Sequence, residues 1–179
     1  MVSNACVLDS IRIADLPALA RLFSDRQVRS FLGGPLKPQW ADQRASELAQ
    51  PSDQVWAIRE RTGSAALLGI VVLDRHHELE DLEVSYLLLP EYWGQGHASA
   101  AVRQVMVHAF GSLGLRRLVA ETQSANAASV RLLERLGFQL LCTAVRFGAE
   151  QSIYSVGPAD VQAANKAFRP GQALQAVPL

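Results

Sequence analysis

The sequence predicts an α/β domain, or α+β in the looser sense, in which helices alternate with the strands of a mixed sheet. Three observations predict this class. Residues 66–73 are almost entirely apolar, as in a strand that is covered on both faces. Residues 98–113 carry apolar side chains at helical spacing. Shorter strand-like segments lie on both sides of that helix.

Length and composition favour one folded domain. The chain has 179 residues, of which 49% are hydrophobic and 19% are charged. A disordered chain needs low hydrophobicity and high net charge, so this composition excludes one. The length suits one domain with a core of its own. We therefore expect a single domain over 1–179, in which 158–179 form a loosely held C-terminal tail.

Charge and cysteine usage exclude several functional classes. Seventeen basic residues balance seventeen acidic ones, so we expect neither nucleic acid nor a membrane surface as a partner. Cys6 and Cys142 are far apart, and no Cys/His spacing typical of a metal site occurs, so no metal is expected. The longest apolar stretch, 65–73, is too short to cross a bilayer, and no signal-peptide pattern precedes it. These features predict a soluble, cytoplasmic protein.

The first elements of the chain are predicted to be a weak strand and two helices. The strand candidate is 5–8. Asp15 is a candidate N-cap for a helix that contains Pro17 in its first turn and ends near Ser24. The second helix fits 39–48, and Pro51 follows its end.

The middle of the chain is predicted to form three consecutive strands, over 55–59, 66–73 and 82–89. A turn at 62–64 separates the first two strands. The polar segment 76–78 separates the second and third, and we expect its two histidines to be solvated.

The second half is predicted to contain a helix, a strand, a helix, a hairpin and one short final helix. The predicted ranges are 98–113, 118–121, 127–136, 138–146 paired with 151–156, and 160–168. Asn126 can cap the second of these helices. Gly137 follows that helix, where a left-handed C-terminal cap is expected.

The loop before the long helix carries the strongest functional signal. It contains Gly94 and Gly96 directly before the predicted helix start. The first N–H groups of a helix lack internal partners, and the helix dipole adds a partial positive charge there. Glycines let a ligand approach the backbone closely. The loop therefore predicts a phosphate or pyrophosphate site, although an ordinary strand-to-helix turn can carry the same glycines. Neither a P-loop nor a three-glycine dinucleotide motif is present.

Three motifs in order resemble the GCN5-related N-acetyltransferase (GNAT) superfamily, and within it the branch of the ribosomal-protein alanine acetyltransferases. They are Glu83-Val84-Ser85-Tyr86 on a strand, the loop 90–98, and the helix motif of 126–138. The resemblance implies the GNAT fold, a mixed central sheet flanked by about four helices. This sheet is splayed between its fourth and fifth strands, here 82–89 and 118–121.

The resemblance also implies an activity. GNAT enzymes move an acetyl group from acetyl-CoA, as co-substrate, to a primary amine by direct transfer in a ternary complex. The implied acceptor is a peptide or protein N-terminus or a small-molecule amine. A non-catalytic acetyl-CoA-binding module and a generic nucleotide-binding domain are the alternatives. The residues expected to hold the cofactor are Leu87, Leu88, Leu89, Trp93, Gly94, Gln95, Gly96, His97, Ala98 and Asn126.

Two residues are candidates for the chemistry. Glu83 is the candidate base, acting through a water if burial raises its pKa, and its alternative is a structural role. Many relatives place a tyrosine proton donor where this chain has Leu133. Ser129, one turn earlier, is the candidate to bond the sulfur, unless it serves only as a capping hydroxyl. The tail after Pro158 is a candidate to dock a second copy of the chain, and the sequence itself does not require a homodimer.

Overall fold

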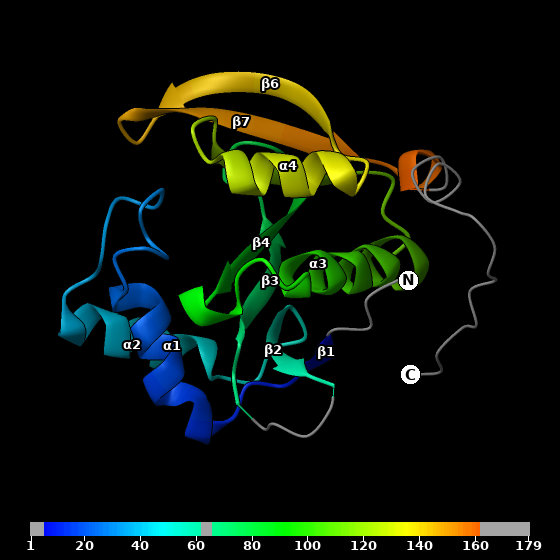
Figure 1. Cartoon of the computed structure of the whole chain (residues 1–179). Helices are drawn as coiled ribbons and strands as arrows, with labels where there is room; N and C mark the ends of the chain where they lie inside the picture. The colour runs from blue at the N-terminus through cyan, green and yellow to red at the C-terminus, as the bar shows by residue number, and fades with distance from the viewer. Residues whose placement is uncertain (1–5, 62–65, 162–179) are drawn as a thin grey trace.

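The computed structural model describes residues 6–61 and 66–161, whose strands form one mixed sheet in the order β1-β2-β3-β4-β5-β7-β6 (Figure 1). Every neighbouring pair is antiparallel except β4 and β5, which are parallel. The strands are β1 (Cys6–Asp9), β2 (Val55–Glu60), β3 (Gly69–Arg75), β4 (Leu82–Leu88), β5 (Leu118–Gln123), β6 (Gln139–Arg146) and β7 (Ala149–Val156).

The helices agree with the predicted order. They are α1 (Leu16–Ser24), α2 (Pro38–Leu48), α3 (His97–Val107) and α4 (Ala127–Arg135). Short turns of helix, η1 (Ile13–Asp15) and η2 (Pro90–Tyr92), precede α1 and α3, and the π-helical turn η3 (His108–Ser112) continues α3. The predicted helix over 98–113 is thus confirmed, although its last turn is π-helical. Within the described ranges, none of the helices has the length and apolar character needed to span a bilayer.

Three predicted elements lie partly or wholly outside the described residues, and the first is the strand 5–8, whose residue 5 is not described. The turn at 62–64 is wholly outside them. Of the predicted tail, 158–161 begin a helical turn, whereas the rest of the predicted 160–168 helix is not among the described residues.

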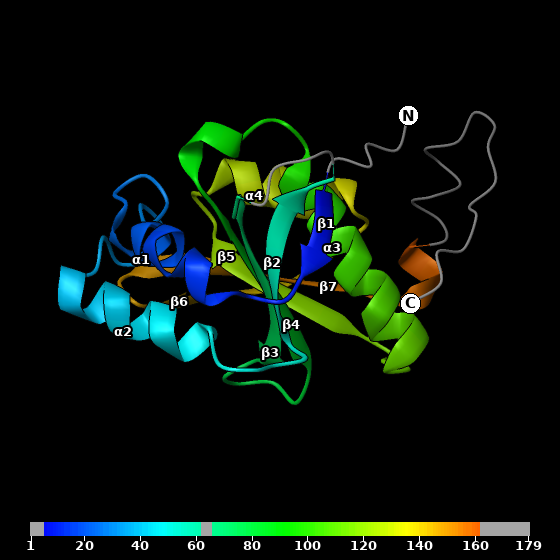
Figure 2. The ribbon, with the colours of Figure 1, turned by 90° about the horizontal axis from the view of Figure 1, so that it is seen from below.

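The helices cover opposite faces of the sheet. Figure 2 shows α1 and α2 on one side of β2, β3 and β4, and α3 on the other. One apolar cluster joins α3 and α4 to the sheet and includes Val71, Val84 and Leu133. The other joins α1 and α2 to the sheet and includes Leu19 and Ile70. This two-faced burial explains the continuous apolar run that predicted β3.

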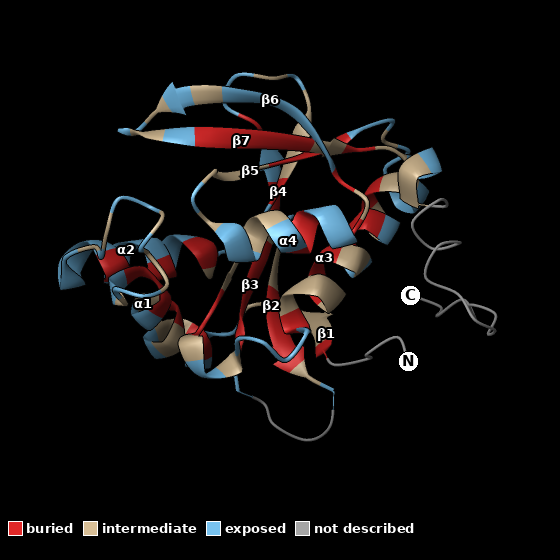
Figure 3. Cartoon of the chain, turned by 45° about the horizontal axis from the view of Figure 1, so that its top comes forward, coloured by how far each residue is buried: buried red, intermediate tan, exposed pale blue. Residues whose placement is uncertain are grey.

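The final hairpin is buried unevenly. β7 lies between β5 and β6 and is buried over most of its length, whereas β6 is the edge strand and is largely exposed (Figure 3). Because an edge strand has only one neighbour, its side chains and backbone stay in contact with solvent.

A buried ion pair ties the start of α1 to the sheet. Arg59 on β2 donates from Nη1 and Nη2 to the two carboxylate oxygens of Asp15, at 3.1 and 2.7 Å. Their side chains are 4% and 6% exposed. The prediction that Asp15 caps α1 is wrong: it occupies the N-cap position but makes no capping bond, because its carboxylate binds Arg59 and the Arg12 N–H. The Asp15 carboxylate thus binds the buried guanidinium of Arg59, which is distant in the sequence, instead of the N–H groups of its own helix.

We expect Asp15→Ala to lower the free energy of unfolding by about 3–5 kcal/mol, because it removes the main partner of a buried guanidinium. Urea denaturation followed by circular dichroism measures this change. Arg44→Ala, which opens the exposed pair with Glu47 on α2, is the control and should leave the transition nearly unchanged. Equal effects of the two substitutions would show that the buried pair does not stabilise the fold.

Candidate functional site

The sheet opens between β4 and β5. The two strands pair in parallel only at Leu82 with Leu118 and at Glu83 with Val119. Beyond these pairs β4 continues to Leu88 alongside β3, while β5 continues alongside β7. The prediction of a sheet splayed between its fourth and fifth strands is confirmed. The divergence leaves the free edge of β4 as one wall of a candidate active site.

Along β4, the backbone N–H and C=O groups of successive residues point alternately toward β3 and toward this gap. The Leu89 N–H donates to Leu68 O at 2.9 Å, toward β3. In an antiparallel ladder the direction reverses at each residue, so the backbone groups of Leu88 and Tyr86 face the gap, and those of Leu87 face β3. Gly69 lies opposite Leu88, and a Cβ there would come within 2.1 Å of the Leu87 carbonyl oxygen. Glycine is therefore required where β3 meets the end of β4.

The loop from β4 to α3 has the conformation that its glycines predict. Gly94 and Gly96 have φ of 73° and 84°, and Gly96 is the N-cap residue of α3. A Cβ on Gly94 would meet no atom within 4 Å, so its positive φ rather than crowding requires glycine. The loop can thus turn sharply into the helix while its backbone stays accessible.

The N–H groups of 94–99 are unused within the described part of the chain. Tyr92 and Trp93 donate their N–H groups inside η2, and the first bond of α3 runs from the Ala100 N–H to Gly96 O, at 3.0 Å. No protein acceptor among the described residues takes an N–H from 94 to 99. A row of free donors at the positive end of a helix dipole is suited to an anion.

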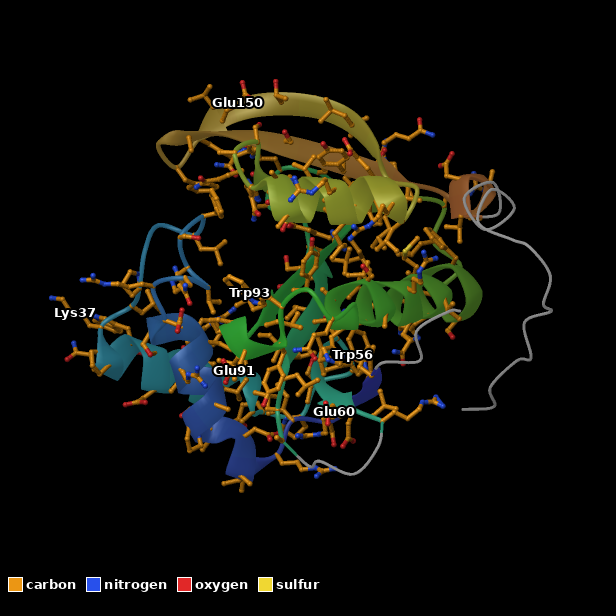
Figure 4. The ribbon with its side chains drawn as sticks, viewed as in Figure 1. Lys37, Trp56, Glu60, Glu91, Trp93 and Glu150 are labelled. Atoms are coloured by element: carbon orange, nitrogen blue, oxygen red, sulfur yellow. The ribbon has the colours of Figure 1, made fainter. Side chains whose placement is uncertain are left out.

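Side chains fix the shape of this loop. The Trp93 indole N–H donates to Leu88 O at 2.8 Å, and the Gln95 side-chain amide donates to Glu91 O at 2.9 Å. Arg21 of α1 makes two bonds to the Glu91 carboxylate, at 2.6 and 2.9 Å. Figure 4 labels Trp93 and Glu91 on this segment, between α1 and α3. These bonds tie the loop to β4 and α1 and support its shape.

His97 contributes backbone to this loop and packs its ring into the protein. Its side chain is buried, and neither ring nitrogen has a hydrogen-bond partner among the described residues. Its carbonyl lies 3.5 Å from the Sγ of Cys6 on β1. Burial raises the pKa of that thiol to about 11, which keeps it protonated and unreactive. His97 thus anchors the start of α3 against β1.

The start of α4 forms the wall of the candidate active site that lies across the gap from β4. Asn126 accepts the Ser129 N–H at Oδ1, at 3.3 Å, and its Nδ2 donates to the Ser129 Oγ at 3.1 Å. The predicted N-cap is confirmed. Gly137, with φ of 91°, ends this segment as predicted. The roles of Asn126 in cofactor binding and of Ser129 in chemistry remain predictions.

Glu83 lies where the two strands part, on the face of the sheet that α1 and α2 cover farther along. Its side chain is half-buried, and the Ser85 hydroxyl lies 3.3 Å from its Oε1. Burial raises the pKa of Glu83, and the Glu121 carboxylate adds to this, while the His76 imidazole and the Ser85 hydroxyl oppose it. A raised pKa is what a base working near neutral pH requires, and the catalytic role stays a prediction.

A polar cluster that the sequence did not predict lies beside Glu83. The expectation that His76 is solvated is wrong: its side chain is fully buried. Its Nδ1 accepts the N–H groups of Glu78 and Leu79, both at 3.1 Å, so Nε2 carries the proton and donates to Glu121 Oε2 at 2.9 Å. Only the tertiary fold brings β5 to this turn, so no local pattern reveals the pair.

Arg146 completes this cluster from β6. Its Nε lies 3.3 Å from Glu121 Oε1, and its Nη1 lies 2.6 Å from the Nε2 of His77. His76, His77 and Glu121 offer ligand atoms within 4.8 Å of one another, which is close enough for a metal ion. The guanidinium already faces the same carboxylate and the same imidazole, and Nε2 of His76 is protonated. The donor set therefore suits a structural ion pair better than a cation site.

A family model and the most similar curated proteins all point to the same family. The family model described as an acetyltransferase (GNAT) domain matches residues 6–139. The uncharacterized N-acetyltransferase YoaA of Bacillus subtilis is 29% identical over 149 residues, which are 76% of this chain and 81% of that protein. The uncharacterized N-acetyltransferase p20 of Bacillus licheniformis is 26% identical over 153 residues, covering 78% of this chain and 82% of p20.

Solved structures share the fold. A GNAT-family acetyltransferase from Bacillus anthracis superimposes with a TM-score of 0.75 at 17% identity, covering 86% of this chain and 95% of that one. Spermidine N-acetyltransferase from Vibrio cholerae, solved in complex with CoA and spermine, gives a TM-score of 0.73 at 15% identity, covering 89% of this chain and 99% of that one. At such identities the likeness establishes the fold alone.

We expect Asn126→Ala to lower the free energy of unfolding by about 1 kcal/mol, because it removes the N-cap of α4. Asn126→Asp keeps the oxygen that accepts the Ser129 N–H, so it should retain most of this stability while losing the donor to the Ser129 hydroxyl. Thermal denaturation of the three proteins measures the difference. If the alanine and aspartate variants melt alike, the capping bond contributes nothing.

Proposed function

Because this chain belongs to the GNAT family of acetyltransferases, we propose that it transfers the acetyl group of acetyl-CoA to a primary amine within a ternary complex. One observation carries the acetyl-CoA part of the proposal: the free N–H groups of 94–99, at the mouth of the gap between β4 and β5. We include the whole chain, 1–179, in this acetyltransferase domain.

The loop is assigned to the pyrophosphate of the cofactor. An anion at 94–98 receives backbone N–H groups at the positive end of α3, which explains how a protein without net charge holds a highly charged ligand. From there the pantetheine arm runs along the free edge of β4, where the Leu88 N–H and the backbone groups of Tyr86 face the gap, while the Leu88 carbonyl is held by Trp93. Asn126 is assigned to the same arm from the opposite wall.

The acceptor is assigned to the face of the sheet that carries Glu83. Nucleophilic attack on the thioester needs a neutral amine, and the pKa of an α-amino group is about 7.7–8.0, against about 10.4 for lysine. Glu83, with its raised pKa, takes the amine proton through a water. We assign a peptide α-amine as acceptor, on the likeness of the three motifs to the ribosomal-protein alanine acetyltransferases.

One observation favours the non-catalytic alternative. Leu133 is fully buried and supplies no hydroxyl where many relatives place a tyrosine. A binding module would hold acetyl-CoA and never release its thiol. Turnover with a panel of peptides and amines, followed as thiol release, separates the two functions. Sustained turnover establishes the enzyme, and none with any amine favours the module.

The cofactor assignment predicts that removing one free N–H weakens binding. Ala98→Pro removes the N–H of Ala98 at a first-turn position that tolerates proline, whereas Ala98→Ser keeps it. We expect the proline variant to bind acetyl-CoA about tenfold more weakly by calorimetry, because a hydrogen bond to a charged group contributes about 1.5–3 kcal/mol. The serine variant should bind acetyl-CoA like the wild type. ATP and NAD should not bind to the wild type as acetyl-CoA does. Equal binding by both variants would overturn the assignment.

The role of Glu83 predicts a pH-dependent loss. A base acts only when deprotonated, so activity should fall as pH drops through the raised pKa of Glu83. Glu83→Gln should lower kcat by about 10²-fold or more and remove this acidic limb from the pH–rate profile. Glu80→Gln, at an exposed carboxylate in the turn before β4, is the control. A wild-type profile in the Glu83 variant would exclude Glu83 as the base.

A further inference from the structure

A buried tyrosine hydroxyl lies on β4 beside the start of α4. Tyr86 lies on β4 opposite Val71, on the face that packs against α3 and α4. Its hydroxyl oxygen is fully buried and makes no hydrogen bond of normal geometry with the described residues, although the Ser129 hydroxyl lies nearby. Leaving a buried hydroxyl without a good hydrogen bond destabilises the fold, and phenylalanine would fill the same space without this cost. An unsatisfied group of this kind calls for a functional explanation.

The surroundings of Tyr86 place its hydroxyl between the two walls of the site. Its backbone faces the gap, just beyond the last pair of β4 and β5. Ser129, in the first turn of α4, is its polar neighbour, and the Ser129 Oγ itself accepts from Asn126. Burial raises the pKa of Tyr86, while the Ser129 hydroxyl and the charge of Arg135 lower it. The phenol is therefore protonated at neutral pH and able to donate.

The reaction needs such a donor. When the amine attacks the thioester carbonyl, a C–N bond forms, the C–S bond breaks and the electron pair leaves on sulfur. The side chain of Leu133, at the position where many relatives carry a proton-donating tyrosine, has no polar atom. Tyr86 reaches the same region from the strand instead of the helix, and it points to the face opposite Glu83 because alternate residues of a strand face opposite ways.

We propose that Tyr86 is the catalytic acid that protonates the departing sulfur of CoA. This inference rests on the proposed acetyltransferase activity. The phenol proton passes to the sulfur, which gives the free thiol and a phenolate. Solvent reprotonates the buried phenolate through its half-buried neighbour, the Ser129 hydroxyl, and the proton lost by the amine leaves through Glu83. The sum is amine plus acetyl-CoA giving acetamide plus CoA thiol.

The test compares two tyrosines on the same face of the sheet. Tyr86→Phe removes the hydroxyl and keeps the ring. Tyr154→Phe, on β7, makes the same change at another buried tyrosine of the same apolar cluster. We expect Tyr86→Phe to lower kcat about 10²-fold with KM for acetyl-CoA within twofold, and to melt at or above the wild-type temperature. Tyr154→Phe should keep wild-type kcat.

A second readout does not depend on turnover. At pH 9 the CoA thiol, with a pKa of about 8.5 in a cysteine-like environment, is largely thiolate and accepts a hydrogen bond from the phenol. Calorimetry should show that Tyr86→Phe weakens CoA binding about tenfold at this pH and leaves binding of desulfo-CoA, which lacks the sulfur, within twofold. A structural role would weaken both ligands alike.

The outcomes separate this inference from the proposed function. Wild-type protein without turnover on any amine would overturn the proposed function, and failure to bind CoA would overturn both. An active wild type with unchanged kcat in Tyr86→Phe would overturn the role of Tyr86 alone. So would equal weakening of CoA and desulfo-CoA. If Tyr86→Phe loses kcat and weakens the binding of CoA but not of desulfo-CoA, Tyr86 is established as the acid.

Discussion

The short parallel pairing of β4 with β5 is the constraint on which the rest of the site depends. Two residue pairs hold the strands together, and beyond them each strand keeps only its other neighbour. The backbone of β4 is then left with hydrogen-bonding groups that no strand satisfies. The same divergence separates the start of α3 from the start of α4, so free N–H donors lie on one side of the opening and a capped helix on the other.

Polar contacts hold the closed end of this opening. Arg117, just before β5, makes two bonds to Asp81, just before β4, at 2.9 and 2.6 Å. The buried His76–Glu121 pair joins the turn after β3 to β5 nearby. Two sheet halves that share so few backbone bonds need such links to keep a fixed angle. These contacts help to fix the angle between the two halves at the opening.

The alternation of β4 puts the two residues proposed for proton transfer on opposite faces of the sheet. Glu83 points to the face of α1 and α2, and Tyr86 points to the face of α3 and α4. In direct transfer the amine approaches the thioester carbon from one side and the sulfur leaves on the other. A strand with an acidic residue and, three positions later, a tyrosine can thus serve both proton transfers, because an odd spacing puts the two side chains on opposite faces.

Local patterns in the sequence determined the elements, since periodicity, glycines and caps act over a few residues. The helical spacing of 98–113, the glycines at 94 and 96 and the cap at Asn126 all appear in the structure as predicted. The tertiary structure alone decided that Asp15 binds Arg59 instead of capping a helix, that His76 is buried against Glu121, and that the Tyr86 hydroxyl is buried beside Ser129. These outcomes depend on residues that lie tens of positions away along the chain, and no local pattern specifies which of many possible partners the folded sheet brings together.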